Sequence, residues 1–160
     1  MAGTLFTIGA VQVFIAAEDH PPPHVHAWHP GEGWRARFRF SYLSDVAGLY
    51  GVRIVNRRPR ARVLTTIVDA IIEDVVRCRA AWWKTHGTRG GLGLVNRRLE
   101  VREGSRRIQV RVALRPAANA IAIRLVGYDP LSQLVRLELA DGRRLSLVAG
   151  EHVEEAEEWS

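Results

Sequence analysis

Four histidines lie within ten residues near the start of the chain, and three prolines separate the first from the second. The segment reads His20-Pro-Pro-Pro-His24-Val-His26, and His29 follows three residues later. Side chains two residues apart on a strand project from the same face, so His24 and His26 are predicted to lie side by side. The stiff prolines fix how His20 approaches this pair.

This histidine cluster could support three kinds of chemistry. His20, His24 and His26 could bind a divalent metal ion such as zinc. A carboxylate ligand, Glu18 or Asp19, is adjacent. Because imidazole titrates near neutral pH, His24 and His26 could instead be the acid and base of a catalytic site. The histidines could also be structural, or contact a phosphate without catalysis, and the sequence leaves these alternatives open.

A basic strand is predicted shortly after the histidines. Residues 34–40 alternate between apolar and arginine side chains, which is the period-two pattern of a strand. The arginines share one face and could follow a phosphate backbone, although a solvated basic face would have the same pattern. The predicted nucleic-acid-binding residues are Arg35, Arg37, Arg39, Arg57 and Arg58.

The charge of the chain permits a polyanionic partner. There are 23 basic and 17 acidic residues, and five of the acidic ones fall in the last ten positions. A basic body often binds nucleic acid. Lys84 is the only lysine, however, and a GC-rich genome would also enrich arginine. The single cysteine, Cys78, excludes an internal disulfide and a cysteine-rich zinc site.

The elements that must position the cluster are predicted as an α+β fold. Residues 4–40 have the composition of an antiparallel β-meander. Apolar residues at helical spacing then predict one long α-helix over about 60–86, packed on the meander. Residues 41–59 show no regular pattern.

A second, mostly antiparallel β region follows a glycine-rich stretch. Strand-like segments recur up to residue 148, and Asp141-Gly142 is a typical hairpin turn. The predicted organisation is a histidine-signature α+β domain at 1–88, a small β-rich region at 94–150 and an acidic tail at 151–160. No apolar run is long enough to span a bilayer, and the start lacks the pattern of a signal peptide, so a cytoplasmic location is expected.

Residues 4–87 resemble a family of short bacterial proteins known as domain of unknown function 4160. In that family an apolar strand pair precedes a Pro-Pro-His-Val-His signature, and a short basic strand and a helix ending in Trp follow it. The long arginine-rich connection at 43–62 departs from the family pattern. The matching pieces are Phe14, Glu18-Asp19-His20, Pro22-Pro23-His24-Val25-His26, Ala36-Arg37-Phe38 and Trp82-Trp83-Lys84-Thr85-His86-Gly87.

Residues 120–148 resemble, more weakly, domain of unknown function 2442. That resemblance rests on two apolar strands and Asp141-Gly142. The two families often occur as neighbouring small genes, similar to toxin–antitoxin pairs. The resemblance therefore implies a bacterial toxin–antitoxin-like or defence-associated protein.

Three functions remain as hypotheses. The first is nucleic-acid binding, RNA included, through the arginine face, with His24 and His26 near the contacted phosphate. The second is a small ribonuclease or metal-dependent hydrolase that uses His20, His24 and His26. The third is a non-catalytic subunit that docks onto a larger protein or ribonucleoprotein, or onto a second copy of the chain. Whether the protein is an enzyme is left undecided, and no membrane partner is expected.

Overall fold

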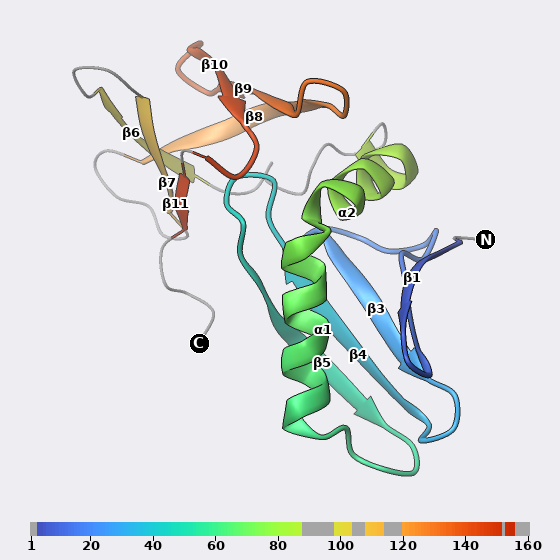
Figure 1. Ribbon diagram of the computed structural model, residues 1–160. Helices are drawn as coiled ribbons and strands as arrows, with labels where there is room; N and C mark the ends of the chain where they lie inside the picture. The colour runs from blue at the N-terminus through green and yellow to red at the C-terminus, as the bar shows by residue number, and fades with distance from the viewer. Residues whose placement is uncertain (1–2, 88–97, 104–107, 114–119, 152, 156–160) are drawn as a thin grey trace.

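The chain forms two mostly antiparallel sheets and a bent helix, which is an α+β arrangement (Figure 1). The computed structural model describes residues 3–87, 98–103, 108–113, 120–151 and 153–155. Among the described helices, none is long and apolar enough to cross a membrane.

The first sheet carries the histidine cluster. Its strand order follows the chain, β1-β2-β3-β4-β5, and every neighbouring pair is antiparallel. Tight turns join β1 to β2 and β3 to β4, and Gly9 and Gly33 in these turns adopt positive φ angles of 56° and 71°. The strands are β1 (Thr4–Ile8), β2 (Val11–Phe14), β3 (His24–His29), β4 (Trp34–Phe40) and β5 (Ala47–Ile54).

The second sheet has the order β10-β9-β8-β6-β7-β11. Its last strand pairs in parallel with β7, so part of the predicted acidic tail is a strand, while residues 156–160 lie outside the described residues. The strands are β6 (Arg98–Glu103), β7 (Ile108–Ala113), β8 (Ala120–Asp129), β9 (Leu134–Leu139), β10 (Arg144–Val148) and β11 (Val153–Glu155).

The prediction of one long α-helix is wrong. The helix divides at Asp74, whose φ and ψ of −114° and 28° are not helical, into α1 (Ala61–Glu73) and α2 (Val75–Trp82). A π-helical turn, η1 (Trp83–Gly87), follows α2. The apolar residues at helical spacing continue across Asp74 because both α1 and α2 bury apolar side chains. The two helices bury them against different surfaces. Figure 1 shows α1 lying over β4 and β5, whereas α2 turns toward the end of the sheet.

A fifth strand occupies part of the segment without a regular pattern. β5 forms the edge of the first sheet, beside β4. Its side chains are exposed or half-buried throughout, so the alternation that marks a half-buried strand is lacking. Gly48 and Gly51 further interrupt the apolar sequence.

The core lies between α1 and one face of the first sheet, and it extends to the second sheet. Ile67 and Ile71 of α1 are fully buried, as are the alternate β4 residues Trp34 and Phe38. The predicted division of β4 into an apolar and a basic face is therefore confirmed.

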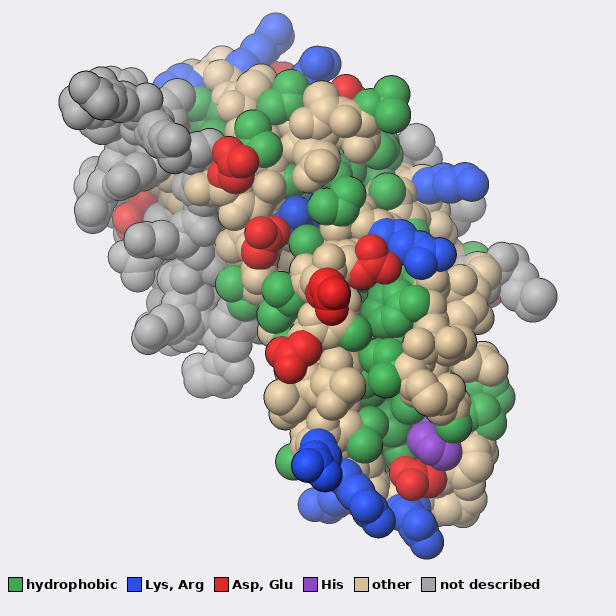
Figure 2. Space-filling view, in the orientation of Figure 1, with side chains coloured by type: hydrophobic (Ala, Val, Ile, Leu, Met, Phe, Trp, Pro, Cys, Tyr) green, Lys and Arg blue, Asp and Glu red, His purple; other side chains and the backbone are tan. Residues whose placement is uncertain are grey.

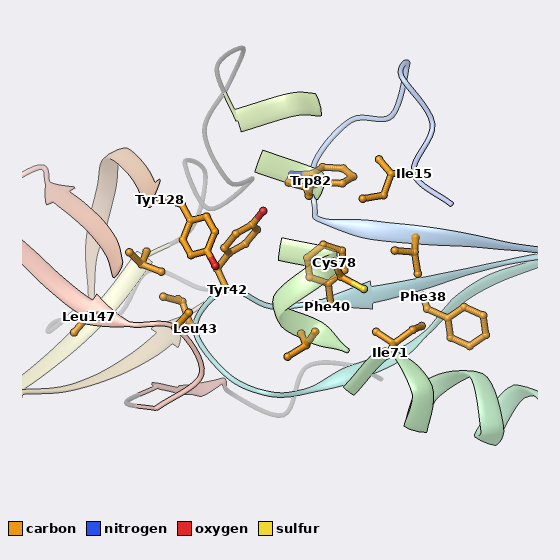
Figure 3. Close-up of a cluster of buried hydrophobic side chains, with 14 of the residues drawn as sticks. Ile15, Phe38, Phe40, Tyr42, Leu43, Ile71, Cys78, Trp82, Tyr128 and Leu147 are labelled. Atoms are coloured by element: carbon orange, nitrogen blue, oxygen red, sulfur yellow. The ribbon is translucent and has the colours of Figure 1, made fainter. Parts of the chain in front are cut away.

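The two sheets meet through aromatic and aliphatic side chains (Figure 3). Tyr42, which follows β4, packs edge-on against Tyr128 of β8 with ring centroids 4.8 Å apart. Leu43 and Leu147 lie beside this pair and are buried. Trp83, the residue after Trp82, also packs edge-on against Tyr128 of the second sheet and is half-buried. The predicted boundary between residues 88 and 94 lies outside the described residues, so the division into domains stays a prediction.

Candidate functional site

The strand register places each aromatic or histidine side chain on one face of β3 opposite an arginine of β4. His24 is directly opposite Arg39, His26 is opposite Arg37, and Trp28 is opposite Arg35. Directly opposed residues of antiparallel strands project from the same face. The face turned away from α1 therefore carries a row of rings beside a row of guanidinium groups.

β5 adds a tyrosine to this face. The β4–β5 register shifts between Arg37 and Phe38, which leaves Tyr50 without a directly opposed residue on β4. A shift of this kind re-aims the side chain of the extra residue. The guanidinium groups of Arg37 and Arg39 lie 4.7 and 5.0 Å from the Tyr50 ring centroid, within range of a cation–π contact.

A glycine leaves room for one of these contacts. A Cβ atom on Gly51 would lie 3.2 Å from Nη2 of Arg37. The absence of a side chain at Gly51 therefore lets the Arg37 guanidinium lie over β5. Arg35 makes the equivalent contact with Trp28, at 5.4 Å from the ring centroid. We call this surface the histidine–arginine face. It consists of His24, His26, Trp28, Arg35, Arg37, Arg39 and Tyr50.

The histidine–arginine face is open to solvent over most of its length. Arg35 and Arg37 are exposed, and Trp28, Tyr50 and His26 are half-buried. Helix α1 packs on the opposite face of the sheet, whereas Trp82 at the end of α2 contacts His24. Figure 2 views that opposite side and shows Asp and Glu side chains along the helices, with Lys and Arg gathered where β5 leads into α1.

At one end of this face, Asp19 brings the two strand histidines together. Nε2 of His26 donates a hydrogen bond to Oδ1 of Asp19 at 2.7 Å, and Nε2 of His24 lies 3.4 Å from the same oxygen. His24 is buried, but 18% of the His26 side chain is accessible, so His26 is the histidine that a ligand can reach. The predicted proximity of His24 and His26 is confirmed, with ring centroids 5.1 Å apart.

Asp19, His24 and His26 are each held in place by a further contact. The backbone N–H of Ala16 donates to Oδ2 of Asp19 at 2.9 Å, and Nδ1 of His24 donates to the Pro22 carbonyl at 2.8 Å. The His26 ring stacks on Phe14 with an interplanar angle of 16°. Burial raises the pKa of Asp19, but the hydrogen bonds with His24, His26 and Ala16 outweigh it and hold that pKa well below its usual range.

The helix end supports the cluster from a second side. The Trp82 ring lies 5.3 Å from the His24 ring and 4.4 Å from the His86 ring. Nε2 of His86 donates to the carbonyl oxygen of Ala16 at 2.9 Å, which fixes the residue whose N–H binds Asp19. His86 thus positions the cluster without joining it.

Other predicted site residues lie apart from the cluster. His20 is exposed, donates from Nδ1 to the Pro21 carbonyl at 3.0 Å, and is not among the three residues whose ligand atoms lie within 4.8 Å of one another. Arg57 and Arg58 are exposed beyond the end of β5, and the Arg57 N–H bonds the Glu32 carbonyl in the β3–β4 turn. They add positive charge at one end of the sheet, and His24 lies at the other end.

Sequence reasoning missed Tyr50 as a member of this face. Its segment lacks periodicity, and its position follows from the register shift rather than from spacing. Trp34, at the start of β4, is fully buried, and its indole N–H donates to Glu32.

Asp19→Asn is expected to lower the free energy of unfolding by about 2 kcal/mol, because charge-assisted hydrogen bonds to both histidines become neutral ones. Urea unfolding measures this change. Glu18→Gln is the matched control, since Glu18 is the adjacent acid and is exposed. An equal change in both variants would show that Asp19 does not hold the cluster together.

Comparison of the chain with protein-family models, with curated proteins and with solved structures found no match in any of the three. The resemblance of residues 4–87 and 120–148 to the two domain families therefore stays a prediction.

Proposed function

We propose that this protein binds single-stranded nucleic acid across the histidine–arginine face. The observation that carries the proposal is the β3–β4 register, which sets Trp28, His26 and His24 opposite three arginines on one sheet face. Among these six side chains only His24 is buried. Open antiparallel sheets with stacking rings and nearby cations are a common platform for single strands.

The spacing of the charges suits an extended polyanion. Arg35, Arg37 and Arg39 alternate along β4, so their Cα atoms are about 6.7 Å apart along the strand. Arg57 and Arg58 continue the positive charge past the end of β5. A backbone lying along β4 would meet these cations in sequence and release their counterions.

The rings beside the arginines offer stacking surfaces for bases. Trp28 and Tyr50 are each covered by a guanidinium group in the free protein. A base can stack on an aromatic ring or on the guanidinium plane itself, and neither contact depends strongly on sequence. His26, which is accessible beside Arg37, would lie next to a bound phosphate.

The test compares two double variants of equal charge change. In Arg35→Gln/Arg37→Gln, affinity for a short single-stranded RNA or DNA is expected to fall about tenfold at low salt, and the salt slope of log affinity to fall by about 0.7 per arginine. Fluorescence anisotropy against salt concentration measures both. The control, Arg62→Gln/Arg77→Gln, removes exposed arginines from the helix side and is expected to bind as the wild type does.

Equal losses in the two double variants would overturn the proposal, because binding would then follow net charge rather than this face. Stronger binding of a duplex than of the single strand would also overturn it.

Cleavage of the bound strand is a second candidate, favoured by one contact. The 2.7 Å hydrogen bond from His26 to Asp19 is the arrangement in which a carboxylate orients a general base, and it leaves Nδ1 of His26 to accept a proton. The same samples report on this candidate, since recovered RNA would be shortened by the wild type and left intact by His26→Ala. A toxin–antitoxin-like or defence role, and docking onto a protein partner or a second copy, stay predictions from the sequence.

A further inference from the structure

The Asp19 cluster has the geometry of an ion-binding site that is distinct from the arginine row. Asp19, His24 and His26 each offer a ligand atom within 4.8 Å of the other two, and Nε2 of His24 and Nε2 of His26 lie 3.4 and 2.7 Å from Oδ1 of Asp19. We propose that Asp19, His24 and His26 bind one divalent transition-metal ion of the zinc class through these atoms.

The direction of the His24 ring supports this assignment. The Pro22 carbonyl can only accept a hydrogen bond, so Nδ1 of His24 is its donor and is not available to a metal ion. The other ring nitrogen, Nε2, is turned toward Oδ1 of Asp19, 3.4 Å away. A metal ion between Nε2 and Oδ1 would bind both atoms and would replace the proton of the hydrogen bond that joins them.

The separations between ligand atoms agree with tetrahedral coordination. Ligands about 2.0 to 2.1 Å from a zinc ion at tetrahedral angles are about 3.3 Å from one another. The His24–Asp19 separation of 3.4 Å already has this value. The His26–Asp19 separation of 2.7 Å must increase slightly. His26 is the least buried of the three side chains, so it is the one with most room to move.

The surroundings match those of metal ligands in proteins. Metal-bound histidine usually donates its other N–H to a carbonyl or carboxylate, as Nδ1 of His24 does to Pro22. Asp19 is likewise fixed through Oδ2 by the Ala16 amide. Two imidazoles and one carboxylate suit zinc and similar ions rather than magnesium or calcium, and they leave a fourth position for water or a substrate oxygen.

This metal site revises the ligand set predicted from sequence. Asp19 takes the place of His20, whose Nδ1 is bonded to its neighbouring carbonyl and whose ring centroid is 6.4 Å from that of His24. The metal site goes beyond the proposed function, because the arginine row can bind a strand whether or not the ion is present.

The experiment titrates untagged, chelator-stripped full-length protein with Zn²⁺ alone by calorimetry, and with Co²⁺ by visible absorption. The wild type is expected to bind one ion and to unfold at a higher temperature when Zn²⁺ is present. Asp19→Asn and His26→Gln are expected to bind at least about 100-fold more weakly, since each loses a direct ligand and even supporting partners account for 10- to 100-fold. His20→Gln is the matched control and is expected to bind as the wild type does.

Two results would overturn the metal site. One is Zn²⁺ binding by the wild type that is no tighter than binding by the Asp19→Asn/His26→Gln double variant. The other is an equal loss of Zn²⁺ affinity in His20→Gln and His26→Gln. The ion would then be bound by several histidines of the segment rather than by Asp19, His24 and His26. Both readouts use the metal alone, so they leave the nucleic-acid proposal to its own test.

Discussion

Arg79→Met is expected to lower the free energy of unfolding by about 2 to 4 kcal/mol, because two buried carbonyl groups lose their hydrogen-bond donors. Arg79 of α2 is only 1% exposed, and its guanidinium links the helix to the segment after β4. Nε donates to the Ser41 carbonyl at 2.8 Å, and Nη2 donates to the Ser44 carbonyl and to Asp45 at 2.9 and 2.8 Å. Methionine fills a similar volume but leaves both carbonyls without these donors.

Urea unfolding of Arg79→Met and Arg77→Met separates this effect from a general loss of charge. Arg77 is on the same helix, but its side chain is 57% exposed and it pairs with Asp74 only at 3.7 Å, so a change below about 0.5 kcal/mol is expected. Arg79→Lys should recover only part of the loss, because an ammonium group cannot reproduce the forked geometry. Equal stability of the two methionine variants would contradict the structural role of Arg79.

Trp82→Ala is expected to cost about 3 to 5 kcal/mol, whereas Trp82→Phe should cost only about 1 to 2 kcal/mol. The Trp82 ring is fully buried and contacts the rings of His24, Phe40 and His86. Its indole N–H has no hydrogen-bond partner among the described residues. Phenylalanine therefore keeps most of the packing and breaks no hydrogen bond seen in this part of the chain.

Chemical unfolding of both variants tests this difference, with Trp28→Ala as the control. Trp28 is half-buried on the histidine–arginine face, so its loss should cost about 1 kcal/mol. A Trp82→Phe variant as unstable as Trp82→Ala would show that the indole N–H is bonded after all, and that the ring does more than fill space.

Local periodicity predicted the parts of the site that depend on a single strand. The alternation of residues 34–40 identified both faces of β4, and the two-residue spacing of His24 and His26 placed them together. These predictions hold because the direction of a side chain on a strand depends only on its position along that strand. The adjacent carboxylates were also recognised, but only the structure selects Asp19 over Glu18.

Local periodicity could not predict the features that depend on contacts between distant segments. Arg79 has the sequence environment of a solvated helix residue, and its burial depends on carbonyl groups 35 and 38 residues earlier. Asp74 interrupts the helix although the helical spacing of apolar residues continues across it, so this spacing does not indicate the bend. Tyr50 reaches the histidine–arginine face through a register shift that no spacing rule signals.

The strict alternation of β4 has a consequence for how such a protein can change during evolution. Its seven residues specify both the hydrophobic core and the charged surface, one set on each face. Replacing a single arginine alters the surface and leaves the core intact. Inserting or deleting one residue would instead exchange the two sets, because a one-residue slip sends every side chain of a strand to the other face. β4 should therefore tolerate substitutions on its charged side and reject changes in length.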